Sequence, residues 1–264
     1  MALARMRGAA AFAAALYLFC TAGLASAEVT QEGNLRVSFT GGIAPHTLPR
    51  KGAAPVKVTF GGEIKTTDGQ APPQLRTITL ALNRNGRLDY RGLPACHYHQ
   101  IHPASTREAI ETCPDSVIGT GTFSANVLLP EQSPFPSSGA ITAFNGLFHG
   151  RHVVFAHVFG TSPLPQSQVL VFELGRRSGT FRTTLTAQLP RVAAEWGYVS
   201  GVSLTLSRVF RYKGRQRSFI SAGCPAPSDF PGAIFSFARA GFGFEDGRTL
   251  QVTMTRSCRA EDGG

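Results

Sequence analysis

Long hydrophobic runs are missing from most of this sequence. After residue 27 no stretch approaches the 18 or so apolar residues that a helix needs to cross a bilayer, so we expect no transmembrane segment there. Internal repeats and low-complexity linkers are also missing, which excludes repeat architectures and a string of tethered domains. Lysine is scarce beyond residue 27 and occurs only at Lys51, Lys57, Lys65 and Lys213.

The short motifs of several enzyme classes are missing as well. There is no Gly-x-Ser-x-Gly elbow, since Gly197 to Gly201 has the wrong spacing, and no His-Glu-x-x-His helix. The phosphate-binding Gly-x-x-x-x-Gly-Lys-Ser/Thr motif is absent, and Gly119-Thr-Gly121 is instead a Gly-rich strand with no helix expected after it. These absences exclude the commonest motif-based hydrolase and nucleotide-binding sites.

A pair of carboxylates for sugar hydrolysis has no sequence motif, because the two groups meet only in the folded protein. Glu173 lies within an apolar strand run, and Glu195 adjoins Trp196, a residue type that stacks on sugar rings. These two acids are the candidates for such a pair. The alternative is that both are ordinary strand-end or ion-paired acids.

The N-terminus has the three-part pattern of a secretory signal. Arg5 and Arg7 are followed by the apolar run Ala9 to Phe19 and then by Ala25-Ser-Ala27, with small residues at both positions that a signal peptidase reads. We predict a cleaved signal peptide over residues 1–27, with an uncleaved membrane anchor as the alternative. Phe19 precedes Cys20 where a lipoprotein signal has a small residue, which argues against lipidation.

Residues 28–264 are then predicted to form a single secreted or cell-surface domain. This part carries 24 Lys and Arg against 16 Asp and Glu, a net charge of +8. Most of the excess is Arg, which binds carboxylate and phosphate through two parallel hydrogen bonds. Anionic cell-envelope polymers or glycans are therefore the partners that the charge favours, and an exported chain is not expected to meet nucleic acid. General solubility and an Arg-favouring codon bias are the alternative.

Four cysteines remain after the predicted cleavage, namely Cys96, Cys113, Cys224 and Cys258. An even count in an exported chain indicates two disulfides, with three possible connectivities. We favour the local pairs Cys96–Cys113 and Cys224–Cys258. Zinc binding is disfavoured because no Cys-x-x-Cys pair is present.

Strand patterns dominate the sequence. Short runs with alternating or β-branched residues are separated by clusters of Gly, Pro and Asn, which predicts an all-β antiparallel β-sandwich. Gly61-Gly62 is expected to end one strand, and residues 134–139 are expected to form a loop. The predicted strands cover residues 35–39, 56–60, 75–82, 117–129, 140–148, 152–159, 169–174, 180–189, 198–211, 216–222, 234–244 and 249–255.

One short helix is expected between the first pair of cysteines. Ser105-Thr-Arg-Glu108 is a capping box, in which the Ser hydroxyl and the Glu carboxylate bond the first free amides of a helix. Pro114 stops this helix just beyond Cys113. The first disulfide is therefore predicted to hold a short helix across a loop.

Several motifs occur together in a specific order. Gly92-Leu-Pro-Ala-Cys96 precedes Cys113-Pro and Ala143-Phe-Asn145, and Ser221-Ala-Gly-Cys224-Pro precedes Phe235-Ser-Phe-Ala-Arg239. In this string, which covers roughly residues 72–258, the chain resembles a group of uncharacterised exported proteins of high-GC Gram-positive bacteria. The resemblance implies a single β-rich exported domain with paired cysteines and implies no activity.

The segment Cys96 to His102 contains three imidazoles within six residues, at His97, His99 and His102. Histidine nitrogen is a favoured ligand of Zn and Cu, and in an extended segment His97 and His99 would point to the same side. Glu108 or Glu111 could orient an imidazole from the helix. The alternative, which we favour, is a polar loop with incidental histidines and no cofactor.

A second group of histidines is His149, His152 and His157. His157 lies among bulky apolar residues, so a buried, hydrogen-bonded side chain is expected. His149 and His152 flank Gly150-Arg151, which is expected to form a hairpin turn. Two imidazoles across a hairpin could ligate a metal, with solvated side chains as the alternative.

The most basic segment contains Arg208, Arg211, Lys213, Arg215 and Arg217 with two aromatic residues between them. Lys213-Gly214 is expected to form the turn of a hairpin. Five cations with interleaved aromatics could bind an anionic polymer by phosphate or carboxylate contacts and stacking. The alternative is a solvated hairpin whose charges prevent strand pairing between molecules.

The sequence therefore favours an exported, non-catalytic domain that is structural or binds at the cell surface. The first alternative is recognition of an anionic polymer or glycan through the 208–217 hairpin and nearby Trp196. The second is a hydrolase with metal or carboxylate chemistry.

Overall fold

The computed structural model describes residues 27–128, 131, 133–162, 165–190 and 197–261. The predicted signal peptide lies outside the described residues except for Ala27. The described chain is mostly β-structure, with two short α-helices and one 3-10 turn between or beside the first pair of cysteines. The helical segments are α1 (Tyr98–Ile101), α2 (Thr106–Thr112) and η1 (Pro114–Ser116). The strands are β1 (Glu28–Glu32), β2 (Leu35–Ala44), β3 (Thr47–Pro49), β4 (Ala54–Pro55), β5 (Lys57–Thr66), β6 (Leu75–Asn83), β7 (Gly86–Leu88), β8 (Cys96–His97), β9 (Val117–Val127), β10 (Phe135–Phe148), β11 (Arg151–Gly160), β12 (Gln166–Arg176), β13 (Phe181–Gln188), β14 (Gly197–Leu206), β15 (Val209–Tyr212), β16 (Arg215–Ser218), β17 (Ile220–Ala222), β18 (Gly232–Phe244) and β19 (Thr249–Glu261).

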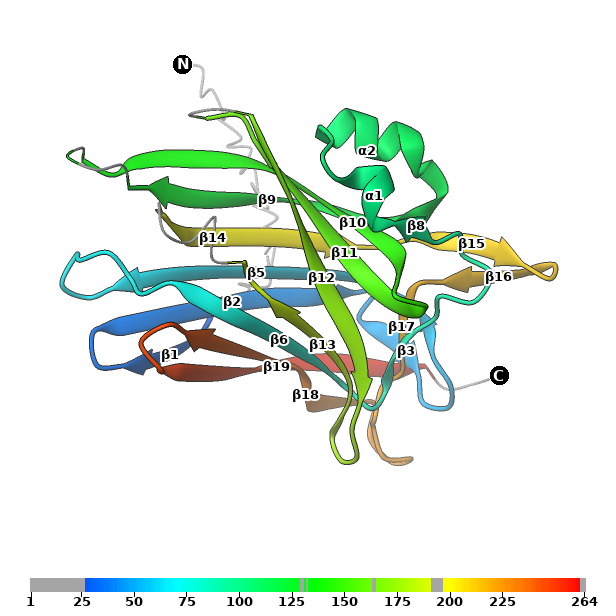
Figure 1. The fold of residues 1–264 in the computed structure, drawn as a ribbon. Coiled ribbons are helices and arrows are strands. Elements are labelled where there is room, and N and C mark those ends of the chain that lie inside the picture. Colours follow the sequence, from blue (N-terminus) through cyan, green and yellow to red (C-terminus); the bar gives the residue numbers. More distant parts are fainter. Residues whose placement is uncertain (1–26, 129–130, 132, 163–164, 191–196, 262–264) are drawn as a thin grey trace, which may run out of the picture.

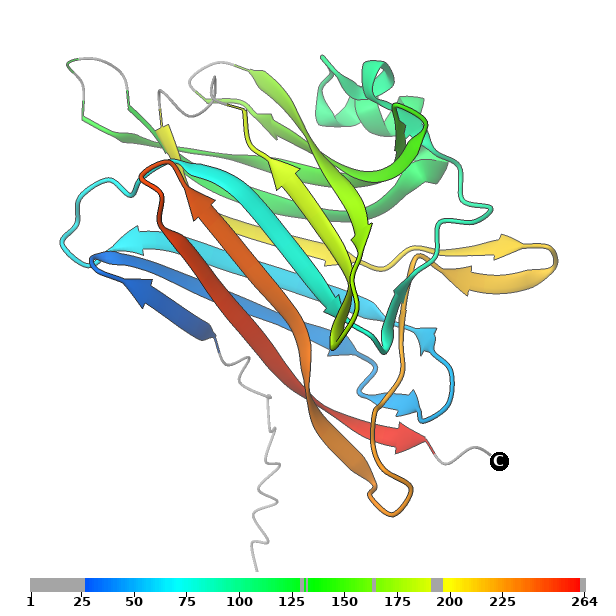
Figure 2. The same ribbon diagram turned by 60° about the horizontal axis from the view of Figure 1, so that its bottom comes forward.

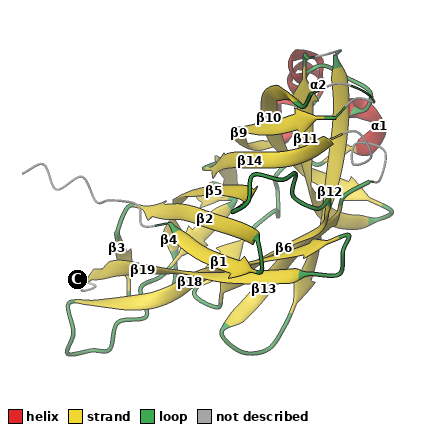
Figure 3. Ribbon diagram, turned by 90° about the vertical axis from the view of Figure 1, so that its left-hand side faces the viewer, coloured by secondary structure: helices red, strands yellow, loops and turns green. Residues whose placement is uncertain are grey.

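One large, mostly antiparallel sheet contains 14 of these strands, in the order β1-β2-β5-β14-β9-β10-β11-β12-β13-β6-β18-β19-β3, with β8 beside β10. The sheet curls, so that β2 and β5 face β6, β18 and β19 across the core (Figures 1 and 3). The long strands β11 and β12 connect the two layers in Figure 1. The fold is therefore sandwich-like, as predicted, and its two layers belong to a single curled sheet.

Aromatic side chains join the two layers. The Phe39 ring on β2 lies 6.0 Å from Phe60 on β5 and 6.4 Å from Phe242 on β18, between ring centroids. Phe60 in turn lies 6.5 Å from Phe237. Gly41 allows the close approach of the layers, because a Cβ there would lie 2.6 Å from the Met254 methyl group on β19. Packing of these rings across the core is what holds the curled sheet closed.

Strands β1 and β19 also approach each other. Arg256 on β19 binds the Glu28 carboxylate at 2.5 Å and donates to the Gly41 carbonyl at 2.8 Å. The Arg256 side chain is only 13% exposed, so this ion pair is partly shielded from water. Strands near the two ends of the described chain are thereby fastened together.

The predicted strand over residues 198–211 is wrong, since the structure divides it between β14 and β15, which belong to different sheets. Two segments predicted to end a strand or to form a loop instead lie within strands. β5 continues through Gly61-Gly62 to Thr66, because β2 and β14 pair with it on both sides and satisfy its backbone groups. β10 begins at Phe135 within the predicted 134–139 loop, and Pro136 lies near the start of the strand, where a proline is tolerated. Pairing with neighbouring strands outweighed the local glycine and proline signals at both places: β2 and β14 at Gly61-Gly62, and β9 at the start of β10.

The helical region lies against the outer side of β10, β11 and β12, where it has its own small core (Figure 3). The predicted capping box is present: Ser105 N donates to the Glu108 carboxylate at 2.8 Å, and Glu108 N donates to the Ser105 hydroxyl at 3.3 Å. Helix α1 was not predicted, since that segment was expected to be extended. Ile101 is fully buried beneath it, which explains why the chain turns inward there.

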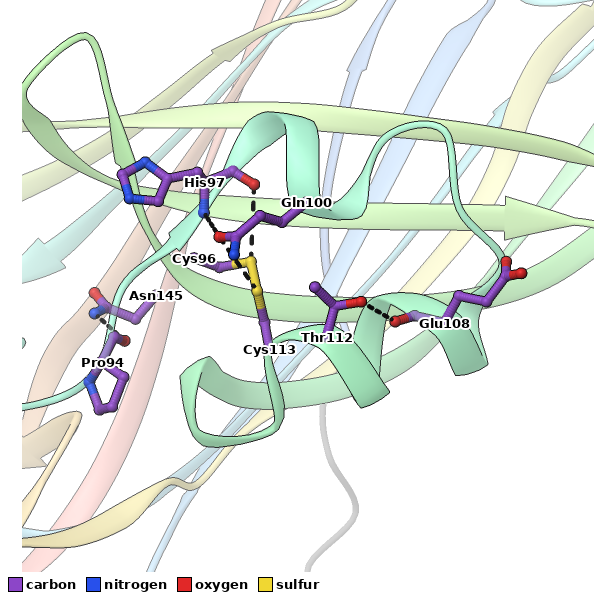
Figure 4. The surroundings of a disulfide bond; sticks show 8 residues. All are labelled: Pro94, Cys96, His97, Gln100, Glu108, Thr112, Cys113 and Asn145. Atoms are coloured by element: carbon purple, nitrogen blue, oxygen red, sulfur yellow. Dashed lines mark hydrogen bonds between the residues drawn. A yellow bond between two sulfur atoms is a disulfide. The ribbon is translucent and has the colours of Figure 1, made fainter.

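Both favoured disulfides are present. Cys96–Cys113 joins the two ends of the helical region, and Cys224–Cys258 joins the segment after β17 to β19, with Cα–Cα distances of 5.8 Å in each (Figure 4 shows the first). Two disulfides fit a β-rich protein that works in an oxidising, extracellular environment. Within the described ranges no helix is long and apolar enough to cross a membrane.

Candidate functional site

The basic segment forms the predicted hairpin. Strands β15 and β16 pair with each other as a separate two-stranded sheet, with Tyr212 opposite Arg215 and Arg211 opposite Gln216. The two-residue turn is Lys213-Gly214, with positive φ angles of 50° and 74°. Glycine is suited to this conformation, and such turns match the natural twist of a hairpin.

The hairpin projects from the body of the protein in two views (Figures 1 and 2). Its base is firmly attached, because Phe219 N donates to the Arg208 carbonyl at 2.8 Å and Phe219 is buried in the main core. Phe210 packs against the same core. The tip of the hairpin is therefore exposed while its base is held in one orientation.

Two of the five cations are tied to acids of the body. Arg217 binds the Asp89 carboxylate at 2.6 Å, and Arg208 binds Asp115 at 3.2 Å. The Arg217 guanidinium also lies 5.4 Å from the centre of the Tyr212 ring. These contacts fix the position of the hairpin, and each is part-exposed, so its contribution to stability is modest.

The Tyr212 ring is the main contact between the hairpin and the loop before the first disulfide. Gly92 has a φ of 80°, and a Cβ at this position would lie 2.0 Å from the ring. Only glycine therefore allows Tyr212 to pack closely against this loop. Tyr212 therefore holds the hairpin against this loop, and its ring also lies beside the charges of Lys213 and Arg217.

The other three cations, Arg211, Lys213 and Arg215, are exposed near the tip. No carboxylate among the described residues lies within ion-pair distance of them. Lys213 Nζ lies 5.5 Å from the centre of the Tyr212 ring. A rigid hairpin with three such cations can donate several charge-assisted hydrogen bonds to phosphate or carboxylate oxygens.

Sequence reasoning missed Asp89 and Asp115 as partners of this segment. They lie 128 and 93 positions away from the arginines that they bind. No local pattern indicates such a pairing, because it depends on how the β7 and η1 regions pack beside the hairpin. Of the five predicted cations, the structure thus separates two anchoring residues from three accessible ones.

The three histidines of the 97–102 segment are divided between two places. His97 and His99 are exposed and their rings stack, with centroids 5.8 Å apart. His102 instead packs edge-on against Tyr98, at 5.2 Å. Within the part of the chain that the structure describes, no group of three His, Cys, Asp or Glu side chains is placed to hold a metal ion.

The two acids expected to orient an imidazole have other partners. Glu108 closes the capping box, and this contact lowers the pKa of its carboxyl through the hydrogen bond from the Ser105 backbone. Glu111 faces Arg107 one helical turn away, at 3.9 Å. Both acids therefore contact residues of their own helical segment, and the orienting role suggested for Glu108 or Glu111 stays a prediction.

The second group of histidines is not brought together as a site. The turn between β10 and β11 is His149-Gly150, rather than Gly150-Arg151, since Phe148 pairs with Arg151. His149 lies against Phe148, and His152 stacks on Tyr90 at 4.0 Å. The rings of these two histidines are thus occupied by separate aromatic contacts.

His157 is fully buried on β11, as predicted. Its Nε2 lies 3.0 Å from the Ala104 carbonyl and 3.2 Å from the Ser167 hydroxyl. Because a carbonyl can only accept, Nε2 carries the proton and donates to it. Burial lowers the pKa of His157, and the nearby His102 adds to this effect, so the ring is held neutral.

This burial predicts a pH-dependent stability. The unfolded chain takes up a proton near the ordinary histidine pKa of 6.5, whereas folded His157 takes it up only at lower pH. The free energy of unfolding should therefore decrease as pH falls below about 6.5, by at most about 1.4 kcal/mol per pH unit, until the folded pKa is reached.

The measurement is urea unfolding of the wild type and of His157→Gln across this pH range. The variant should lose that part of the pH dependence, and His99→Gln, which changes an exposed histidine, is the matched control. Parallel pH profiles for wild type and His157→Gln would show that the idea is wrong.

Only one member of the candidate carboxylate pair, Glu173, lies within the described residues. Glu173 is exposed on β12, opposite Val153 on one side and Thr186 on the other. Glu195 and Trp196 lie outside the described residues. A hydrolase function therefore stays a prediction without a structural counterpart.

Comparisons of this chain with models of protein families, with curated proteins and with solved structures find no match. The function is therefore inferred from the geometry of the described residues.

Proposed function

We propose that this protein is an exported, non-catalytic binding domain that recognises an anionic cell-envelope polymer through the β15–β16 hairpin. The observation that supports the proposal most directly is that two of the five cations are ion-paired while the other three are exposed. Arg208 and Arg217 are tied to acids and orient the hairpin, whereas Arg211, Lys213 and Arg215 are exposed at its tip.

Rigid presentation favours binding to a repeating anion. The hairpin is held at its base by a backbone hydrogen bond and two ion pairs, and next to its turn by the packing of Tyr212, so little conformational freedom is lost when a ligand binds. Arg211 and Arg215 can bind phosphate with two parallel hydrogen bonds each, and Lys213 adds a point charge. This arrangement of three cations is complementary to a wall polymer that is rich in phosphate.

Export is part of the same proposal. The predicted signal peptide at residues 1–27 would deliver the domain to the cell surface, and the two disulfides are consistent with an oxidising location there. The proposed kinship with uncharacterised exported proteins of high-GC Gram-positive bacteria agrees with such a location.

The test is retention of purified protein on isolated cell walls, before and after the phosphate polymer has been stripped from them. Replacing Arg211, Lys213 and Arg215 together by Ala should weaken retention about tenfold or more, because each lost charge-assisted contact contributes about 0.5–1 kcal/mol at an exposed site. Retention should also fall with added salt, which screens exposed charges.

The matched control replaces Lys57, Lys65 and Arg182 by Ala, since these exposed cations lie on other strands and the change in net charge is the same. Full retention is expected for the control. If the hairpin variant binds as well as the wild type, the hairpin is not the binding element. If both variants lose binding equally, attraction depends on net charge alone.

A further inference from the structure

A shallow groove lies across the outer face of β13, β6, β18 and β19, the face that points away from the main core. Its volume is about 740 Å³, within the range of ligand-binding clefts. Neither the hairpin nor the helical region contributes to its lining.

The register of the four strands places polar side chains in rows across this face. Thr186, Thr79, Gly241 and Gln251 lie side by side in one row. Gln188, Thr77, Gly243 and Thr249 form the next row. The Thr77 hydroxyl donates to the Gln188 amide oxygen at 3.0 Å, and the hydroxyls of Thr79 and Thr186 lie 3.3 Å apart. Hydroxyl and amide groups therefore line a face that has few aliphatic side chains.

The two glycines in these rows leave the floor of the groove bare. A Cβ added at Gly241 would make only ordinary contacts, at 3.8 Å or more, and one added at Gly243 would lie 3.4 Å from Thr77. Neither glycine has a positive φ. Local packing would thus tolerate side chains at both positions, and their absence keeps a strip of backbone open between β6 and β19.

A guanidinium group lies at one end of the groove. The Arg239 guanidinium lies 4.4 Å from the centre of the Phe181 ring, and its Nε donates to the Thr253 hydroxyl at 3.2 Å. Arg239 is nevertheless exposed, and no acid among the described residues pairs with it. Arg177 also lines the groove and no carboxylate does, whereas the exposed Glu173 on β12 lies outside the lining, opposite Thr186. The lining therefore combines hydroxyl groups with positive charge.

We propose that this groove binds a short stretch of an acidic oligosaccharide, with a sugar carboxylate on Arg239 and sugar hydroxyls on the side chains that line it, namely Thr77, Thr79, Thr249 and Gln251. Such a ligand complements the lining in charge and in hydrogen-bonding groups. The bare backbone at Gly241 and Gly243 gives a sugar ring room to lie flat across neighbouring strands, which are about 4.8 Å apart. This site is separate from the hairpin and does not depend on its function.

The experiment is calorimetric titration of the full chain with a short oligogalacturonate and with the same oligosaccharide after reduction of its carboxyl groups. Saturable binding of the acidic form is expected, and the reduced form should bind about tenfold or more weakly, because its contact with Arg239 is lost. Arg239→Gln should weaken binding of the acidic form to a similar extent.

A second variant tests whether the exposed backbone at Gly241 is needed for binding. Gly241→Val places a side chain in the strip and should abolish binding, and Gly241→Ala should weaken it if the valine variant does not fold. Arg87→Gln, which changes an exposed arginine on β7, is the control and should bind as the wild type does. Melting temperatures show whether each variant is folded.

The proposal is overturned if the wild type shows no saturable binding, if the reduced oligosaccharide binds equally well, or if Arg239→Gln and Gly241→Val bind like the wild type. The hairpin variant at Arg211, Lys213 and Arg215 should retain full affinity for oligogalacturonate. Loss of binding in that variant would assign the oligosaccharide to the hairpin instead, so failures of the two proposals are distinguishable.

Discussion

Removal of the Cys224–Cys258 disulfide is expected to lower the free energy of unfolding by about 4 kcal/mol. The two cysteines are 34 positions apart, and closing a loop of this length restricts the unfolded chain by about that amount on the chain-entropy model. Both cysteines are buried in the main core, at 1% and 4% exposure, so their replacement also removes packing. This is a large part of the total stability of an ordinary domain.

The location of this bond explains why its loss should affect the whole fold. Cys224 follows the short strand β17, and its backbone N–H donates to the Pro49 carbonyl at 3.0 Å. Cys258 lies on β19, which pairs with β18 and β3. The disulfide thus connects the segment after β17 to β19 of the large sheet, and its removal allows these two parts to separate.

The measurement is urea unfolding of the variant with Cys224→Ala and Cys258→Ala. The variant with Cys96→Ala and Cys113→Ala is the comparison, since its 17-residue separation predicts a smaller effect of about 3 kcal/mol. An unfolding midpoint equal to that of the wild type would show that the disulfide is not a determinant of stability.

The second large effect is expected at Phe39, where Phe39→Ala should lower the free energy of unfolding by about 3–5 kcal/mol. The side chain is 4% exposed and its ring contacts Phe60 in its own layer and Phe242 in the other. Truncation leaves a cavity between the two layers, and the surrounding rings can fill it only in part.

Phe230→Ala provides the matched control, because the same chemical change is made at a ring that is 59% exposed. Its effect should stay within about 0.5 kcal/mol, as for most surface substitutions. Equal destabilisation by the two variants would contradict the idea that Phe39 packs between the two layers of the sheet. Both variants can be measured by the same urea unfolding experiment.

The fold places the two proposed binding surfaces on different parts of the molecule. The hairpin is held by the β7 and η1 regions through Asp89 and Asp115, whereas the groove lies on the outer face of β13, β6, β18 and β19. An envelope polymer that carries both phosphate and acidic sugar has groups complementary to both surfaces. Binding to the hairpin variant and to Arg239→Gln separates the two contributions.

Local features were predicted well from the sequence. The Ser105 capping box, the Lys213-Gly214 turn and both disulfide pairs are present as expected. The capping box and the turn depend on groups that lie close in sequence. The disulfides were predicted by pairing each cysteine with the nearer of its possible partners. Alternation of apolar and polar residues likewise predicted most strands, because side chains on a strand point to opposite faces.

Features that depend on distant pairing were predicted less well. The strand through Gly61-Gly62 continues because Thr40 and Ser203 lie opposite Gly61 on two neighbouring strands. Helix α1 forms where Ile101 reaches the small core under the helical region, so the 97–102 histidines are not arranged as an extended segment would place them. The groove could not be predicted, because its rows are formed by strands from residues 75 to 261.

The sequence alone determined the β-rich composition of this protein, its helix cap, its hairpin turn and its cysteine pairs, because each follows from contacts between near neighbours or from the period of a strand. The tertiary structure alone decided that the strands form one curled sheet. It also decided which arginines are tied to Asp89 and Asp115, and which threonines share a face with Arg239. These contacts join residues far apart in the chain, and they exist only when backbone hydrogen bonding and core packing fix the register of the strands.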